Sequence, residues 1–293
     1  MDIDNKLVAL IKLLEDPDPQ IQEVVQHEIG KYGMEVLPSL EFVNTRTMDI
    51  AVKEKLGVLI QKMRFEALYA KFSKWSSADD PSMIEGVYLL SKWLDNEVKW
   101  EEFHDLFNQI KLNVWLELSQ TLTPFEKIHV INSIFYNYYH FKLFPEGGLL
   151  AYNPFHLMTE HVGNKSSIAL LYIAVCEALD IPIFAIDIPE IIIMGYFDDL
   201  SSFFISEEET ELKLQHFIDP ESGFIHGYEE VMFYLQQFIK SNERPTLRAL
   251  KNKELMVVVL RFMNEDQSIT SDVSFENIKQ QLNMLLDLIE GNL

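Results

Sequence analysis

A chain of 293 residues, 48% of them hydrophobic and 24% charged, is long enough to bury a large core. Its 46 acidic and 24 basic residues give a formal net charge of -22, which repels phosphate backbones and anionic lipid, so we expect neither nucleic acid nor a membrane surface as a partner. The single cysteine, Cys176, excludes an internal disulfide and a cysteine-rich zinc site. With no signal peptide recognisable at the N-terminus, we expect a cytoplasmic protein, and no cofactor is predicted.

Helix follows helix from Lys6 to about Lys74, because apolar residues recur there at intervals of three and four positions. The stretch from Asp16 to Leu40 resembles half of a HEAT-type helical repeat. The polar run that begins at Ser76 predicts a domain boundary. The predicted regions are a HEAT-like helical region at 1–76, a helical region at 77–150, a core at 151–240, and C-terminal helices that pack on the core at 241–293.

Three more helices are predicted between the boundary and the core. Their expected ranges are Met83 to Leu94, Trp100 to Leu116, and Pro124 to Phe141. Thr123 followed by Pro124 is typical of a helix start, because the threonine oxygen can accept a hydrogen bond from the first turn and proline suits the first helical position.

The core is expected to begin with a loop through Tyr152-Asn-Pro and a short helix. The next helix is apolar on nearly all sides from Ile168 to Leu179, which predicts that it is buried on nearly all sides. Ser166 and Ser167 are interpreted as its caps. Three strands are expected to follow, over Ile183 to Ile188, Ile191 to Tyr196, and Leu212 to Ile218. The run Asp219-Pro-Glu-Ser-Gly223 predicts a turn after the third strand.

Helical spacing returns after this turn, and the last predicted helix has Ser274 as its cap. The expected ranges are Tyr228 to Ile239, Thr246 to Met263, and Phe275 to Ile289. Helices, then a buried helix feeding an antiparallel sheet, then helices again predict an α+β fold.

Three segments in and beside the core carry a distinctive pattern: Asn153-Pro-Phe-His-Leu-Met-Thr-Glu-His-Val-Gly163, Ser167-Ile-Ala-Leu-Leu-Tyr-Ile-Ala-Val-Cys-Glu-Ala-Leu-Asp-Ile-Pro182, and His216-Phe-Ile-Asp-Pro-Glu-Ser-Gly223. Together they resemble the bacterial, SirB-type branch of the transglutaminase-like superfamily. The flanking blocks Glu85 to Trp93, Ile131 to Phe135 and Arg248 to Asn252 are also similar to that branch. The resemblance implies a papain- or transglutaminase-like core. In such a core a helix N-terminus activates a nucleophile, a histidine takes its proton and an aspartate orients the histidine.

Compared with the family pattern, the catalytic set of this chain is incomplete. Ser167 stands at the Ser/Thr position of the family motif Gly-x-Pro-x-Ser/Thr-Leu, Lys165 replaces the proline, and no cysteine lies nearby. Ile191 stands where the family motif Pro-Gly-His-Phe has its histidine, and only Asp219 is retained. The degenerate triad positions are therefore Ser167, Ile191 and Asp219. The candidate cleft residues are Lys165, Ser166, Ser167, Glu190 and Asp219.

Other residues offer weaker catalytic candidates. His216 is near Asp219 in sequence, but alternation along a strand would point the two side chains to opposite faces. Cys176 is too far along its helix for the N-terminal amides to lower its pKa, and it is interpreted as a small buried hydrophobe. Lys165 and Ser167 could be imagined as a serine-lysine dyad, but two positions apart at a helix start their side chains point in nearly opposite directions. The dispersed histidines predict no metal site.

The leading functional hypothesis is a transglutaminase-like protein without catalysis that binds a protein or peptide and acts as a regulatory module. One alternative is a residual serine-dependent amidase or acyl transferase that uses Ser167 and Asp219 with a base not identified in the sequence. The other alternative is a purely structural helical scaffold.

Overall fold

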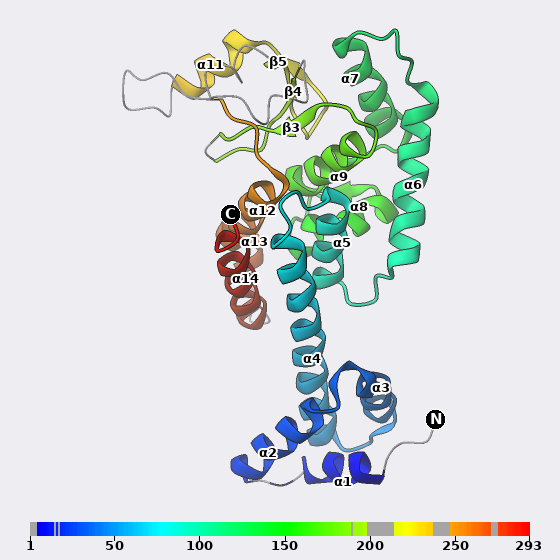
Figure 1. Cartoon of the computed structure of the whole chain (residues 1–293), viewed down its shortest axis with the longest axis vertical. Coiled ribbons are helices and arrows are strands. Elements are labelled where there is room, and N and C mark those ends of the chain that lie inside the picture. Colours follow the sequence, from blue (N-terminus) through cyan, green and yellow to red (C-terminus); the bar gives the residue numbers. More distant parts are fainter. Residues whose placement is uncertain are drawn as a thin grey trace. The chain divides into compact units, whose positions relative to one another are not determined.

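The computed structural model describes residues 5–14, 16, 18–188, 190–197, 214–236, 247–270 and 275–293. The chain divides into two compact units, Met1–Lys71 and Phe72–Leu293. The division falls inside the long helix α4 (Ile50–Ser76), coloured light blue to cyan in Figure 1. Among the described helices, none combines the length and the apolar character that crossing a bilayer requires.

The first unit is built from helices, as predicted for this region. They are α1 (Asn5–Leu13), α2 (Pro19–Gly30), the 3-10 turn η1 (Gly33–Val36), α3 (Leu37–Arg46) and the first part of α4. Helix α2 begins after Asp18, whose carboxylate accepts a hydrogen bond from the amide of Gln20 at 2.9 Å. Ile29, Leu40 and Leu56 are fully buried in the core of this unit. The similarity to a HEAT repeat stays a prediction.

The second unit contains most of the described helices. They are α5 (Met83–Leu94), α6 (Trp100–Glu117), α7 (Pro124–Asn132), α8 (Pro154–Glu160), α9 (Lys165–Glu177), α11 (Tyr228–Gln236), α12 (Asn252–Glu265), α13 (Gln267–Thr270) and α14 (Phe275–Glu290). The predictions at 83–94 and 100–116 are confirmed. The predicted cap of α7 is also confirmed, because the Thr123 hydroxyl oxygen accepts from the amide of Glu126 at 3.3 Å. After Asn132 the helix continues as the π-helix η2 (Ser133–Tyr138) and ends before the predicted Phe141.

Two small sheets accompany these helices. One is a parallel pair, β1 (Lys142–Leu143) with β2 (Val162–Gly163). The other has four antiparallel strands in the order β3 (Ile183–Ala185), β4 (Met194–Phe197), β5 (Leu214–Ile218) and β6 (Ile225–His226). The α+β class and the antiparallel sheet are confirmed. The strands predicted at 183–188 and 191–196 are shorter or shifted in the structure, positions 212–213 lie outside the described residues, and β6 was not predicted.

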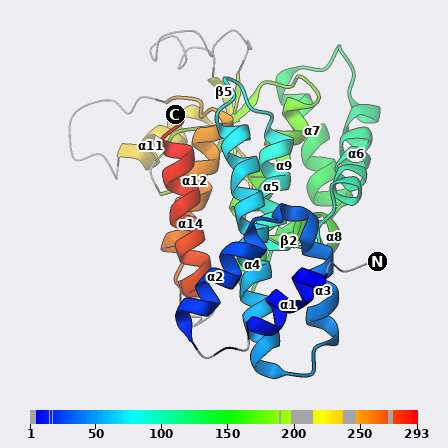
Figure 2. The same ribbon diagram turned by 60° about the horizontal axis from the view of Figure 1, so that its bottom comes forward.

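Helix α9 is central to the second unit. Every residue from Ser166 to Cys176 is buried, as its apolar sequence predicts. It packs on α5, α8 and β3, whereas α11 lies on the sheet through Met232 and Leu235, which meet Phe217 of β5 in one buried cluster. Figure 2 shows α12 and α14 side by side at the C-terminal end of the chain.

The C-terminal helix pair is linked to α9 through one carboxylate. Glu177, the last residue of α9, accepts hydrogen bonds from the amide of Met83 at 2.8 Å and from the side-chain amide of Asn252 at 2.5 Å. Asn252 also donates to the carbonyl of Pro81 at 3.0 Å. The first residues of α5 and α12 are thereby held at the same end of α9.

The helix predicted at 246–263 begins later, at Asn252, which corrects the sequence-based boundary. Ala249 instead forms an antiparallel bridge with Ile186, and the amide of Leu250 donates to the carbonyl of Ala185 at 2.8 Å. This segment therefore pairs with backbone groups at the outer edge of β3. The helix predicted at 275–289 corresponds to α14, and its predicted cap, Ser274, lies outside the described residues.

Candidate functional site

The N-terminus of α9 is capped by Asn164, not by the serines that follow it. The side-chain oxygen of Asn164 accepts from the amide of Ser167 at 2.9 Å. The Ser167 hydroxyl accepts from the amide of Asn164 at 2.9 Å and donates to the carbonyl of the same residue at 3.0 Å. This reciprocal capping box makes Asn164 the cap and places Ser167 at the third helical position.

Gly163 leaves the space that this cap requires. A Cβ atom at position 163 would lie 2.4 Å from the hydroxyl oxygen of Ser167 and 3.2 Å from a methyl carbon of Leu157. Ser167 is fully buried and is not one of the residues that line the neighbouring pocket. The degenerate nucleophile position is therefore not part of the pocket wall, and its hydroxyl stabilises the helix start.

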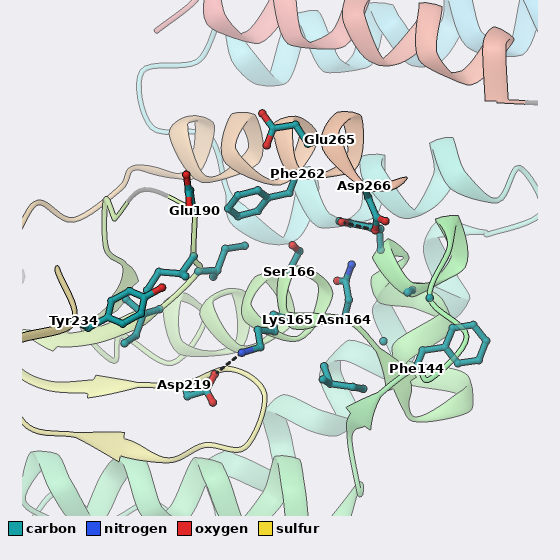
Figure 3. Close-up of a pocket in the computed structure, with 18 of the residues that line it drawn as sticks. Phe144, Asn164, Lys165, Ser166, Glu190, Asp219, Tyr234, Phe262, Glu265 and Asp266 are labelled. Atoms are coloured by element: carbon teal, nitrogen blue, oxygen red, sulfur yellow. Dashed lines mark hydrogen bonds and ion pairs between the residues drawn. The ribbon is translucent and has the colours of Figure 1, made fainter. Parts of the chain in front are cut away.

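A pocket of about 810 Å³ opens at the start of α9. Figure 3 shows Asn164, Lys165 and Ser166 on one side of it, and Glu190, Phe262, Glu265 and Asp266 along the other. The remaining lining residues are Leu143, Phe144, Gly147, Ala151, Tyr152, Gly163, Ile191, Ile192, Ile193, Asp219, His226, Glu230, Val231 and Tyr234. Of the five candidate cleft residues, Lys165, Ser166, Glu190 and Asp219 line this pocket, and Ser167 does not.

Lys165 joins the start of α9 to the turn after β5. Its ammonium nitrogen lies 2.8 Å from a carboxylate oxygen of Glu221 and 3.7 Å from one of Asp219. Burial by itself lowers the pKa of Lys165. The hydrogen bond to Glu221 and the charges of both carboxylates raise this pKa by more than burial lowers it, so the net shift is upward. Lys165 is therefore a stable cation, engaged away from the Ser167 hydroxyl.

Asp219 is built into the turn that its sequence predicts. One carboxylate oxygen accepts from the amide of Glu221 at 3.1 Å, and the other accepts from the hydroxyl of Ser222 at 3.3 Å. The amide of Gly223 donates to the Asp219 carbonyl at 2.8 Å. The interpretation of Asp219 as a turn residue is confirmed.

Two residues from the α7–η2 region hold this turn from outside. The Tyr136 hydroxyl donates to the carbonyl of Pro220 at 2.9 Å, and the side-chain amide of Asn132 donates to the carbonyl of Gly223 at 2.6 Å. Burial, with a smaller contribution from the charge of Asp219, raises the pKa of Tyr136. Tyr136 thus stays protonated and keeps its donor role.

The segment at position 191 supplies the apolar wall of the pocket. Ile191, Ile192 and Ile193 all line it and precede β4. Glu190, which stands at the glycine position of the family motif Pro-Gly-His-Phe, has a φ of 66°. That left-handed backbone favours glycine, so the conformation suited to glycine is occupied by a residue that has a side chain.

His216 lies outside the pocket. It pairs with Tyr196 of β4, and its ring centroid is 5.6 Å from that of Phe125 in α7. Cys176 is fully buried, and burial raises the pKa of its thiol, which confirms its interpretation as a small hydrophobe.

The histidine that does line the pocket is His226, which the sequence did not indicate. It lies on the short strand β6, and its Nδ1 is 3.2 Å from a carboxylate oxygen of Glu230 in α11. The only sequence signal is the i,i+4 spacing of these two residues, which has no meaning until β6 and α11 are placed beside the start of α9.

The end of α12 also contributes unpredicted residues. Asp266 accepts from the Tyr152 hydroxyl at 3.1 Å and from the amide of Ser268 at 2.8 Å. Burial and the adjacent Asp266 raise the pKa of Tyr152, so this hydroxyl remains a donor. Glu265 lies beside Asp266 on the same wall of the pocket.

The chemistry available at the pocket is hydrogen bonding and ion pairing. Its lining carries five carboxylates, one lysine, one histidine, the side-chain amide of Asn164 and the hydroxyls of Tyr152, Ser166 and Tyr234. Over the part of the chain that the structure describes, no three acidic, histidine or cysteine side chains are grouped so that they could hold a metal ion.

Comparison with known proteins identifies the family. A family model described as the transglutaminase-like superfamily matches residues 101–264, which is more than half of the chain. The matched span runs from α6 to the last turn of α12 and includes every pocket residue except Glu265 and Asp266. No curated protein and no solved structure matches the chain.

Proposed function

Because this chain belongs to the transglutaminase-like superfamily, we propose that it is a member without catalysis that binds a protein or peptide in the pocket at the start of α9. Binding there would make it a regulatory module. The single observation that carries the proposal is the hydrogen bonding of Ser167, whose hydroxyl donates to and accepts from the backbone of Asn164.

A serine becomes a nucleophile when a general base removes its proton. The proton of Ser167 is directed to the Asn164 carbonyl, and Ser167 does not line the pocket that a substrate would enter. Ile191, at the histidine position, has no atom that could accept a proton, and Asp219 is occupied by its own turn. These features support binding over acyl transfer.

We further infer membership of the SirB-type, bacterial branch, a HEAT-like N-terminal region and a cytoplasmic location. The branch assignment is supported by the segments Asn153 to Gly163, Ser167 to Pro182 and His216 to Gly223. The HEAT-like assignment is supported by the consecutive helices of the first unit.

Absence of catalysis is tested with a serine-directed fluorophosphonate probe and with amide and peptide substrates. We expect no adduct at Ser166 or Ser167 when labelled protein is mapped by mass spectrometry, and no turnover. An adduct on Ser167, together with turnover that Ser167→Ala abolishes, would establish the residual serine enzyme instead.

Peptide binding is tested on an array of peptides of systematically varied sequence. Ile191→Trp would fill part of the pocket, so we expect it to reduce capture of the peptides that the unchanged protein binds. Leu112→Trp is the matched control, because Leu112 is exposed on α6 and does not line the pocket. Equal capture by both variants would favour the alternative in which helical surfaces act as a scaffold.

A further inference from the structure

The geometry of the pocket points to the class of peptide that it takes, and this inference rests on the proposed function. We infer that the ligand is a basic segment. A backbone carbonyl of the peptide accepts hydrogen bonds at the start of α9, and a lysine or arginine side chain lies among the carboxylates of the opposite wall.

Three donors at the start of α9 have no acceptor among the residues that the structure describes. Ser166 is 4% exposed and lines the pocket, and its hydroxyl forms no hydrogen bond with any described part of the chain. Lys165 and Ser166 are the first two helical residues, so their amides have no acceptor within the helix, and none is found elsewhere among the described residues. The hydroxyl of this buried serine opens onto the pocket beside two such amides, where an oxygen acceptor such as a peptide carbonyl can accept hydrogen bonds from them.

The charge of the pocket favours a cation. Five carboxylates line it, against Lys165 and His226, and both of these already face carboxylates of the protein. Glu190 and Glu265 form no ion pair or hydrogen bond within the described residues. A carboxylate ligand would gain from the helix N-terminus but would be repelled by this wall, whereas a neutral carbonyl linked to a cation satisfies both sides.

Apolar surface connects the two polar regions. Ile191, Ile192, Ile193 and Phe262 line the pocket, and Figure 3 shows Phe262 on the same side as Glu190 and Glu265, across from Ser166. Lysine and arginine side chains have apolar stems that pack on such surface while the charged end reaches carboxylates. The same surface gives little reason to prefer a short, fully polar cation.

The test measures binding of fluorescently labelled pentapeptides Ala-Ala-X-Ala-Ala to the full chain by anisotropy, where X is lysine, arginine, norleucine or glutamate. We expect the lysine and arginine peptides to bind about tenfold more tightly than the norleucine peptide, and the glutamate peptide to bind most weakly. Increasing salt should narrow the difference between lysine and norleucine.

Two variants test separately the contact of the peptide carbonyl with the start of α9 and the contact of the cation with the carboxylates. Ser166→Ala should weaken all peptides by a similar factor, on the order of threefold to tenfold, because it removes a donor to the backbone. Glu265→Gln should weaken the lysine peptide and leave the norleucine peptide unchanged. Glu117→Gln is the control, because Glu117 is an exposed acid at the end of α6 and lies outside the pocket.

Each outcome is informative. The norleucine or glutamate peptide could bind as tightly as the lysine peptide or more tightly, with this binding still reduced by Ile191→Trp. That result would overturn the basic ligand and leave the proposed function standing. Binding of no peptide would overturn both. Pentylamine could displace the labelled lysine peptide as strongly as the unlabelled lysine peptide does, with the binding of pentylamine unchanged by Ser166→Ala. That result would show that the cation is a free aliphatic amine and would overturn the peptide ligand.

Discussion

The hydroxyl oxygen of Ser167 lies 2.9 Å from the backbone nitrogen of Asn164 and 3.0 Å from its carbonyl oxygen. Its hydrogen-bonding capacity is thus directed to the backbone at the start of α9. The neighbouring hydroxyl of Ser166 faces the pocket and makes no such bonds within the described residues. The two adjacent serines therefore differ in surroundings: Ser167 is bonded to the helix start, and Ser166 is the one that we infer contacts a ligand.

This difference predicts unequal effects of two matched substitutions. Ser167→Ala should lower the free energy of unfolding by about 1 kcal/mol, because it removes half of the capping box. Ser166→Ala should change it by less than about 0.5 kcal/mol. Urea unfolding followed by circular dichroism measures both, and a larger loss in Ser166→Ala would contradict the assignment.

Gly163→Ala should be destabilising because its new methyl group would meet the Ser167 hydroxyl. We expect a loss of about 1–3 kcal/mol in the free energy of unfolding. In the double variant with Ser167→Ala, the loss should be smaller than the sum of the two single losses, because the clashing oxygen is gone. If the loss in the double variant equals the sum of the two single losses, contact of the new methyl group with Leu157 or the backbone, and not with Ser167, destabilises Gly163→Ala.

Glu190→Gly should stabilise the protein. Glu190 has a φ of 66°, and a left-handed conformation costs roughly 1–2 kcal/mol for a residue with a side chain. Part of that gain is offset by the greater freedom of glycine in the unfolded chain, so we expect a net increase of about 0.5–1 kcal/mol. Glu190→Gln removes the charge but keeps the Cβ, and an equal increase in this control would assign the effect to charge instead.

His216 should make the stability depend on pH. Partial burial lowers its pKa below the ordinary value of 6.5, so the unfolded chain binds the proton more readily than the folded one. The contribution of His216 to the free energy of unfolding is therefore present above pH 6.5 and is lost as the pH falls through the pKa of the folded state.

The measurement compares His216→Gln with the unchanged protein in urea at pH 8 and at about pH 5, on either side of this transition. The unchanged protein should lose more of its free energy of unfolding than the variant does on acidification. The ring signals of His216 in an NMR titration should give a pKa below 6.5. Parallel losses in the two proteins would refute the assignment.

Much of the fold could be predicted from the sequence, because local patterns determine it. The apolar residues on every side of α9, the Thr123-Pro124 start of α7 and the turn at Asp219 are each encoded within a few neighbouring residues. The start of α12 was placed too early, because the pairing of Ala249 with Ile186 overrides helical spacing. That pairing joins residues 63 positions apart, and no local pattern reports it.

The composition of the pocket was only partly predictable. Lys165, Ser166, Glu190 and Asp219 could be proposed because a family motif aligns them. His226, Glu230, Glu265 and Asp266 reach the same cavity from β6, α11 and the end of α12, and they depend on tertiary packing. The interpretation of both serines as caps was incomplete, because a capping box places its reciprocal partner three residues after the true cap, Asn164.

The hydrogen bonds to Glu177 set a lower limit on any fragment that is to keep the contacts among α5, α9 and α12. Its carboxylate takes one donor from Met83 and another from Asn252, so these three residues must be present in the same polypeptide. A piece cut at the edges of the 151–240 core would lose both donors and the start of α5. Crystallisation or NMR work on a shortened protein should therefore retain at least Pro81 through Asn252, together with the rest of α12.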